Sequence, residues 1–228
     1  MEIKKIIALV PMRHHSQRVS GKNYRALAGK PLFHHIIETL DQVPLLSGIV
    51  VDTDSPVIIE QLKKEFPKVQ IIDRPQHLQG DTVPMNEILM VDTGQIPADM
   101  YLQTHSTNPL VTIESIQKAL QIMIAKYPAY DSLFSVTRIQ ARLWDSLARP
   151  INHNPSILLQ TQDLPPVYEE NSCFYLFTRQ TLENRRSRIG ERPYLFELSK
   201  SEAWDIDEEE DFAIAEMIMK SRHGNSLV

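Results

Sequence analysis

The sequence holds a single cysteine, Cys173, and only seven glycines among its 228 residues. One thiol excludes an internal disulfide framework and a cysteine-rich zinc site. An excess of positive charge is also missing, because 29 acidic residues outnumber 24 lysines and arginines and give a formal net charge of −5. We therefore expect no nucleic-acid partner, since affinity for phosphate backbones requires a basic surface.

Long hydrophobic runs are scarce as well. The apolar run Ile6–Val10 is followed closely by charged residues and is too short for a signal sequence or a bilayer-spanning helix. We expect a cytoplasmic protein with no membrane partner. With 42% hydrophobic and 23% charged residues, the chain has the composition of a globular protein. A chain of this length can bury roughly 70% of its unfolded surface.

Short apolar segments alternate with longer amphipathic ones, which predicts an α/β fold around a mostly parallel sheet. The expected strands are Ile6–Pro11, Ile49–Asp52, Val69–Asp73, Met100–Thr104, Leu133–Thr137 and Ser172–Phe177. The expected helices are Leu32–Asp41, Pro56–Glu65, Pro84–Val91, Thr112–Lys126 and Glu208–Ser221. The proline-rich stretch Gln140–Glu170 follows neither period. We predict that it protrudes from a single domain covering residues 1–228.

The loop after the first expected strand is the first candidate site, since ligands in doubly wound sheets bind beyond the carboxyl ends of the strands. It carries three cations, a serine and a glycine within residues 13–22: Arg13, Ser16, Arg18, Gly21 and Lys22. Guanidinium and ammonium groups can surround a polyphosphate. The loop matches neither the Walker A nor the GxGxxG pattern. Taken alone, it fits a phosphate site and a solvated basic loop equally well.

Six sequence blocks, in order, resemble the CMP-N-acetylneuraminate synthetase family of cytidylyltransferases. They are residues 11–32, Val51–Asp54, Asp73–Pro75 with Gly80–Thr82, Leu102–Leu110, Pro166–Asn171 with Phe174–Tyr175, and Asp205–Asp211. The resemblance covers nearly the whole chain. It implies a Rossmann-like sheet of the nucleotide-diphospho-sugar transferase type with a protruding dimerisation arm. It also implies a reaction in which CTP and a 2-keto-3-deoxy sugar acid give a CMP-sugar and pyrophosphate.

The resemblance implies roles for individual residues. Arg13, Lys22 and Asp207 would be catalytic. The nucleotide would be bound by Arg13, Ser16, Lys22, Asn23, Arg74, Asp81 and Thr82, and the acidic sugar by Gln103, Ser106, Asn171 and Tyr175. Asp205 and Asp207 would hold Mg²⁺, the expected cofactor. A homodimer is implied too, with the 140–170 excursion helping to build the neighbour's sugar site.

Simpler structural roles stay open for several of these residues. Asp205 and Asp207 could be acids at a helix N-terminus, and Arg74 an ordinary loop residue. Gln103 could satisfy backbone groups, and Tyr175 could be a core aromatic. The histidine pairs His14–His15 and His34–His35 lack the partners of a zinc site. We expect His34 and His35 at the surface or at an interface.

The sequence departs from the family where the sugar carboxylate should bind. Thr161 stands at the position of a family arginine, and Asp145 falls near the position of a family lysine. Arg142 or Arg149 could supply the missing cation. His14 and His15 replace small or amide residues in the first loop. Two other functions therefore remain open: another sugar nucleotidyltransferase of the same fold, and a non-catalytic nucleotide-binding homologue.

Overall fold

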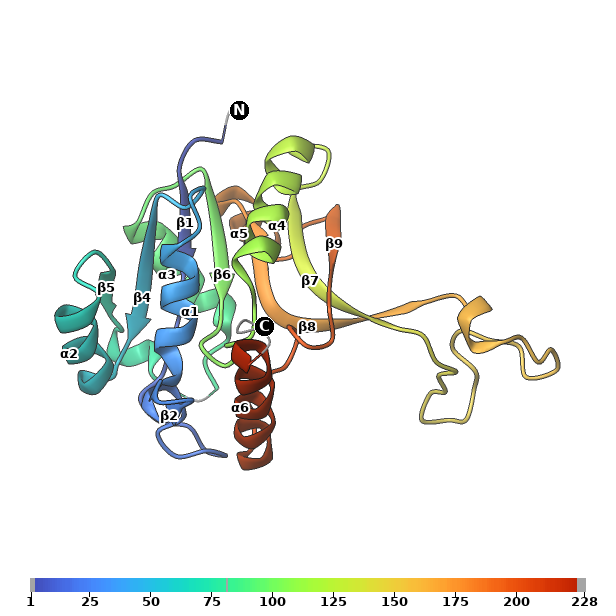
Figure 1. Ribbon diagram of the computed structural model, residues 1–228. Helices are drawn as coiled ribbons and strands as arrows, with labels where there is room; N and C mark the ends of the chain where they lie inside the picture. The colour runs from blue at the N-terminus through green and yellow to red at the C-terminus, as the bar shows by residue number, and fades with distance from the viewer. Residues whose placement is uncertain (1–2, 81, 225–228) are drawn as a thin grey trace.

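Seven strands form one mixed sheet in the computed structural model, which describes residues 3–80 and 82–224 (Figure 1). The strand order is β5-β4-β1-β6-β8-β7-β9. The strands are β1 (Ile6–Leu9), β4 (Gly48–Thr53), β5 (Gln70–Asp73), β6 (Met100–Thr104), β7 (Ser132–Ile139), β8 (Val167–Phe177) and β9 (Pro193–Leu198). Only β8 runs against its neighbours, pairing antiparallel with β6 and β7. The expected α/β fold with a mostly parallel sheet is confirmed.

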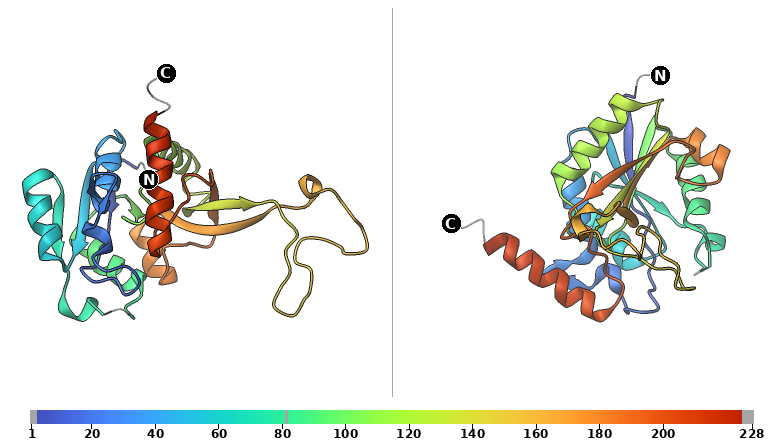
Figure 2. Two further views of the ribbon diagram at one scale, coloured as in Figure 1. Left: turned by 60° about the horizontal axis from the view of Figure 1, so that its bottom comes forward. Right: turned by 90° about the vertical axis from the view of Figure 1, so that its right-hand side faces the viewer.

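Helices cover both faces of this sheet, as the end-on view in Figure 2 shows. One face packs against α1 (Leu32–Asp41), α2 (Pro56–Glu65) and α4 (Ile113–Lys126), and the opposite face packs against α3 (Met85–Gln95) and α5 (Arg179–Arg185). Alternate residues of β1 divide between the two cores: Ile6 and Ala8 face the first, and Ile7 and Leu9 the second. Parallel strands covered on both faces read as continuous apolar runs, which is why these strands could be predicted.

All six expected strands and five expected helices are present, and α1 and α2 match their predicted bounds. Apart from a two-residue-per-strand hairpin and the 3-10 turns, the elements that the prediction missed are β9 and α5. β9 is a half-exposed edge strand, and α5 spans only seven residues after its Thr178 cap. β8 also begins at Val167, five residues earlier than predicted, because its first half is polar and is recognisable only by its pairing with β7.

The segment between β7 and β8 projects from the sheet as an arm (Figures 1 and 2). It contains one short 3-10 turn, η3 (Thr161–Asp163), and an isolated bridge between Trp144 and Pro150. The predicted excursion therefore protrudes, although its last four residues, Val167–Glu170, belong to β8.

The C-terminal helix α6 (Glu209–Gly224) packs on the first loop of the chain and not on the sheet core. Its Phe212 and Ala215 join Val19, Leu27 and Leu32 in a separate apolar cluster. The loop is pinned there by a small hairpin of β2 (Ala26–Leu27) and β3 (Lys30–Pro31). This packing brings residues 205–207 beside the cationic loop.

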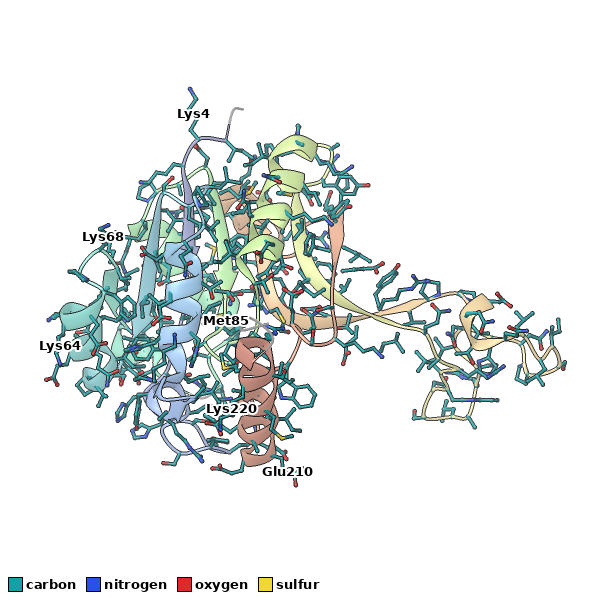
Figure 3. All side chains as sticks on the ribbon, viewed as in Figure 1. Lys4, Lys64, Lys68, Met85, Glu210 and Lys220 are labelled. Atoms are coloured by element: carbon teal, nitrogen blue, oxygen red, sulfur yellow. The ribbon has the colours of Figure 1, made fainter. Side chains whose placement is uncertain are left out.

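Charged side chains lie mainly on the outer surface, where Lys64, Lys68 and Lys220 point into solvent (Figure 3). The expectation that His34 and His35 lie at the surface or at an interface was wrong, since both are buried within the chain's own fold in α1. His35 Nε2 lies 2.9 Å from the Leu27 carbonyl oxygen, and the His34 ring packs edge-on against Phe33 and Phe66.

Among the described helices, none combines the length and apolarity needed to cross a bilayer.

Candidate active site

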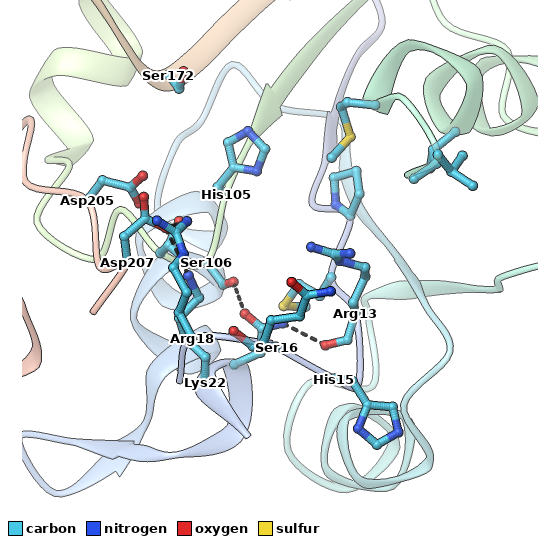
Figure 4. Close-up of a pocket in the computed structure, with 18 of the residues that line it drawn as sticks. Arg13, His15, Ser16, Arg18, Lys22, His105, Ser106, Ser172, Asp205 and Asp207 are labelled. Atoms are coloured by element: carbon cyan, nitrogen blue, oxygen red, sulfur yellow. Dashed lines mark hydrogen bonds and ion pairs between the residues drawn. The ribbon is translucent and has the colours of Figure 1, made fainter. Parts of the chain in front are cut away.

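A cavity of about 530 Å³ opens beyond the carboxyl ends of β1, β5 and β6. Its wall combines four cationic side chains with two carboxylates: Arg13, Arg18, Lys22, Arg74, Asp205 and Asp207. Figure 4 shows Arg13 on one side of this space and the two aspartates on the other. Parallel strands direct their following loops to one edge of a sheet, so residues far apart in sequence meet there.

Gly21 shapes the cationic loop. Its φ of 63° lies in the left-handed region, and a Cβ at this position would be 2.7 Å from the Tyr24 ring. The turn begins the 3-10 segment η1 (Lys22–Tyr24), which directs Lys22 into the cavity and buries Asn23. Glycine at this position therefore determines where the lysine points.

A hydrogen-bond chain fixes the base of the cavity. The Ser106 hydroxyl donates to Asn23 Oδ1 at 2.7 Å, and Asn23 Nδ2 donates to the Arg13 carbonyl oxygen at 2.7 Å (Figure 4). Ser106 and Asn23 are both buried. These two hydrogen bonds hold the loops after β1 and β6 at a fixed separation. Ser16 lies on the same wall of the cavity.

Asp207 receives two cations from the first loop. Arg18 Nη2 lies 2.6 Å and Lys22 Nζ 3.3 Å from Asp207 Oδ1. Lys22 also donates to the Ile206 carbonyl oxygen at 2.7 Å. The Asp211 carboxylate accepts the N–H groups of Asp207 and Glu208, which fixes the turn before α6. Lys22 and Asp207 thus form one charged unit.

Asp205 lines the cavity next to this unit. Its Oδ1 is buried and has no hydrogen-bond partner among the described residues. Burial raises the pKa of Asp205, and the nearby Asp207 charge adds to this effect. An acceptor oxygen in this condition fits a cation supplied from outside the chain. Within residues 3–80 and 82–224, no group of three or more histidine, cysteine or acidic side chains is placed to hold a metal by itself.

A buried charged triad supports the part of the cavity wall that Arg74 forms. The Arg74 guanidinium pairs through Nε with Asp52 Oδ1, and both side chains are almost completely buried. Asp92 of α3 lies beside them, and burial together with the Asp52 charge raises the pKa of Asp92 to about 8. One cation and two carboxyl groups are neutral together only when one carboxyl keeps its proton. Arg74 Nη1 remains without a hydrogen-bond partner among the described residues.

His105 follows β6 and lines the centre of the cavity (Figure 4). Burial lowers the pKa of His105 to about 3, and the Arg188 and Lys22 charges act in the same direction. Its Nε2 lies 3.0 Å from Gln103 Nε2, an amide donor. The ring is therefore neutral near pH 7, with its proton on Nδ1.

The structure does not bring all the predicted sugar-side residues to the cavity wall. Ser106 lines the cavity. Gln103 and Tyr175 are fully buried behind the wall: Gln103 contacts the lining residue His105, and Tyr175 contacts the lining residue Ser172. The side chain of Asn171 bonds to Ser135 and Thr137 on β7. Substrate roles for Gln103, Tyr175 and Asn171 stay predictions.

On the nucleotide side, Thr82 is exposed between cavity residues Gly80 and Val83, and Asp81 lies outside the described residues. The two histidines of the first loop separate. His15 lines the cavity, whereas His14 Nδ1 lies 2.8 Å from the Ser55 hydroxyl that caps α2.

Thr161 and Asp145, the substitutions for family cations, both lie in the arm. Asp145 pairs with Arg149 at 2.6 Å, and Thr161 begins η3. Arg142 donates to the Leu159 carbonyl oxygen. In this chain, the arm arginines therefore bond to groups of the arm itself.

Sequence reasoning missed His105, Arg188 and the Asp52–Asp92 pair. His105 directly follows the end of a predicted strand, so the strand-end rule could have identified it. Arg188 and Asp92 carry no local signal, because their importance arises from packing against residues that are distant in sequence.

A mostly parallel sheet whose strand-end cavity joins a cationic loop to carboxylates fits a nucleotidyltransferase. A sequence model described as cytidylyltransferase matches residues 7–222, and the chain belongs to this family of enzymes. It is 29% identical to a CMP-N,N'-diacetyllegionaminic acid synthase of Legionella pneumophila, over 95% of this chain and 97% of that protein. It is 23% identical to a pseudaminic acid cytidylyltransferase of Campylobacter jejuni, over 98% and 100% of the two chains.

The fold is similar to that of solved cytidylyltransferase structures. A CMP:2-keto-3-deoxy-manno-octonic acid synthetase complexed with CTP superposes with a TM-score of 0.72, at 17% identity, over 96% of this chain and 99% of that one. The expected sheet of the nucleotide-diphospho-sugar transferase type is confirmed by this similarity.

Proposed function

We propose that the protein transfers the cytidylyl group of CTP to the anomeric hydroxyl of a 2-keto-3-deoxy sugar acid, releasing pyrophosphate. The observation that carries this proposal is the cavity that Arg13, Asp205 and the Lys22–Asp207 pair line together, in a chain of the cytidylyltransferase family. The names of the relatives, a legionaminic acid synthase and a pseudaminic acid cytidylyltransferase, support a nonulosonate as the acceptor.

In this reaction the anomeric oxygen attacks the α-phosphorus, and the bond from that phosphorus to the pyrophosphate oxygen breaks. The work of the protein is to position the reactants and to neutralise charge. Arg13, Ser16, Lys22 and Asn23 would hold the triphosphate, because all four line the cavity. Lys22 is the central group, since its ammonium reaches both the cavity and Asp207.

The chain's residues fit a bound Mg²⁺. Asp205 and Asp207 present carboxylate oxygens from one turn, and the unpartnered Asp205 Oδ1 is a free ligand position. Mg²⁺ in proteins commonly takes one or two carboxylates and completes its shell with water and substrate phosphates. When bound there, the ion would supply charge neutralisation for the phosphate groups.

The base would lie on the Arg74 side of the cavity. Arg74 Nη1 is a buried donor without a partner, and cytosine offers a carbonyl oxygen and a ring nitrogen as acceptors. The residues around Gly80 would cover the other edge of the nucleoside. A consumer of CTP also fits the cytoplasm, where we place the enzyme.

The arm supports a homodimer. It exposes a cluster of large apolar side chains, of which Leu158 is 88% and Leu147 70% exposed, together with Trp144, Ile151 and Ile157. Clusters of this kind on a soluble protein mark interaction surfaces. We propose that the arm packs on a second copy of the chain, near the neighbour's sugar site.

Pyrophosphate release from CTP and Mg²⁺ tests the function directly. The acceptor panel is N,N'-diacetyllegionaminate, pseudaminate, N-acetylneuraminate and 3-deoxy-manno-octulosonate, with UTP and ATP as nucleotide controls and EDTA as the metal control. We expect release with CTP and at least one sugar acid, and none with EDTA. Equal turnover of UTP, or activity only with a sugar phosphate, would favour the other nucleotidyltransferase function. CTP binding without turnover would favour the non-catalytic homologue.

A further inference from the structure

We propose that Arg188 of the same chain binds the carboxylate of the sugar acid and makes the enzyme selective for acids. This inference rests on the proposed function. It concerns a residue in the loop between α5 and β9 that the sequence blocks did not include. The observations that support it are a backbone anchored by hydrogen bonds, a guanidinium without an acidic partner, and contacts through Gln103 and Tyr175 to the cavity wall.

The loop that carries Arg188 is fixed from several directions. The Arg188 N–H donates to Asn86 Oδ1 of α3 at 3.2 Å, and the Gly190 N–H donates to the Ser132 hydroxyl at 2.8 Å. Asp131 then accepts the N–H groups of the next two residues, at 3.0 Å each. A Cβ at position 190 would be 2.2 Å from the Asp131 carboxylate, so glycine is required for this close approach. Such anchoring gives the side chain a defined origin.

The guanidinium is held without being neutralised. Its Cζ lies 3.5 Å from the centre of the Tyr175 ring, and Nη1 donates to Gln103 Oε1. Among the described residues it forms no ion pair with a carboxylate. Glu170 attracts it only through space, since that carboxylate accepts the Tyr175 hydroxyl. Burial lowers the pKa of Arg188, because desolvation disfavours the charged form, while Tyr175 and Glu170 act in the opposite direction. A half-buried cation in this condition binds an added anion strongly.

Two short connections join Arg188 to the cavity. Gln103 contacts His105, and the Ser172 hydroxyl lies 3.1 Å from the Tyr175 hydroxyl oxygen, to which it can donate. His105 and Ser172 both line the cavity. Ser172 has a φ of 58°, a strained conformation for a serine and one more often found at functional sites. Arg188 keeps part of its surface exposed, whereas Gln103 and Tyr175 are fully buried. Arg188 is not among the described residues that line the cavity, and an anion would reach its guanidinium by entering past His105 and Ser172.

Lys22 and Arg188 lie on opposite sides of His105, and we assign them to different groups of the substrates. Lys22 pairs with Asp207 on the phosphate side, and Arg188 lies beyond neutral His105 on the other side. In a 2-keto-3-deoxy sugar acid the carboxylate is attached to the anomeric carbon, next to the attacking hydroxyl. A substrate with its hydroxyl near the α-phosphorus would direct its carboxylate away from the triphosphate. The arm arginines bond within the arm, so Arg188 supplies the cation that the Thr161 and Asp145 substitutions remove.

The test compares a sugar acid with its neutral carboxamide as acceptors, using whichever acid of the panel the wild type turns over. We expect Arg188→Gln to raise the KM for the acid about 10- to 100-fold, the range for loss of a charged hydrogen bond. The KM for CTP should stay within about twofold, which also shows that the variant is folded. In Arg188→Gln, the preference for the acid over the carboxamide should fall by the same factor by which the KM for the acid rises. Arg188→Lys should retain part of this preference, because lysine keeps the positive charge.

The matched control is Arg185→Gln, which removes an exposed arginine paired with Glu191 in the same region. It should leave both acceptors unaffected. If Arg188→Gln retains the wild-type preference for acid, the inference is overturned while the proposed function stands. If Arg188→Gln does not fold, Arg188→Met, which keeps an unbranched side chain without the charge, takes its place, and an unchanged acid preference and acid KM overturn the inference equally. If the wild type turns over none of the acids, the proposed function fails and this inference fails with it.

Discussion

Substitution of Asp92 alone, compared with substitution of Asp92 and Asp52 together, tests whether the two carboxyl groups of the buried triad under the cavity share one proton. Arg74 pairs with Asp52, and Asp92 is fully buried beside them without an ion pair to Arg74. Asp92→Asn keeps a group that can donate to Asp52 and leaves the charges balanced. The double variant Asp52→Asn, Asp92→Asn leaves Arg74 buried with no counter-charge.

The two variants should differ widely in free energy of unfolding. Removing one partner of a buried ion pair costs about 3–5 kcal/mol, because it leaves an uncompensated charge. We expect that loss for the double variant and less than about 1 kcal/mol for Asp92→Asn. At this chain length, 1 kcal/mol corresponds to about 2–4 °C in Tm. The double variant should therefore melt at least about 6 °C below the wild type.

The same triad makes stability depend on pH. Burial and the Asp52 charge raise the pKa of Asp92 in the folded state to about 8, from the ordinary 3.8 of an aspartate. A raised pKa stabilises the fold fully below the unfolded value, and this stabilisation is lost as the pH rises through the folded value. Linkage gives a loss of about 2–3 kcal/mol between about pH 6 and pH 9. Asp92→Asn should lack this loss, because the asparagine does not titrate.

Urea unfolding followed by circular dichroism, repeated across this pH range, measures both effects. The difference between the wild type and Asp92→Asn isolates the Asp92 contribution from that of other titrating groups. Equal pH dependence in the two proteins would show that Asp92 is ionised when folded. An Asp92→Asn variant as unstable as the double variant would refute the charge balance inferred for the triad.

Two further predictions concern the cationic loop and the arm. Lys22→Ala should lower kcat/KM for CTP about 10²- to 10³-fold, as expected when one preorganised charge contact to the transferring group is lost. The neighbouring Arg25→Ala, which removes a pair with Glu209 outside the cavity, should change it little; equal effects in steady-state kinetics would contradict the assignment. Leu158→Asp should convert a dimer to a monomer in analytical ultracentrifugation, whereas Met217→Asp on exposed α6 should not. A wild type that sediments as a monomer would disprove the dimer.

Much of the architecture could be predicted because its signals are local. Apolar runs mark the central strands, which are covered on both faces. Pro56 after the Ser55 cap sets the start of α2, and Pro31 precedes α1, so both helices begin where expected. β9 and α5 escaped prediction, since an edge strand and a seven-residue helix leave weak periodicity. His34 and His35 were misjudged because their polarity suggested exposure, although aromatic and backbone contacts accommodate both rings inside the fold.

The candidate site, too, could be predicted only in part. The chemistry of each segment is visible in the local sequence: a cationic loop follows β1, and acidic residues precede α6. Tertiary structure alone decided that Lys22 meets Asp207, 185 positions away, and that Arg188 lies against Tyr175 without a carboxylate partner. It also decided that Asp52, Arg74 and Asp92 share one buried environment. Local patterns cannot encode these facts, because burial and the balance of neighbouring charges arise only when distant segments pack together.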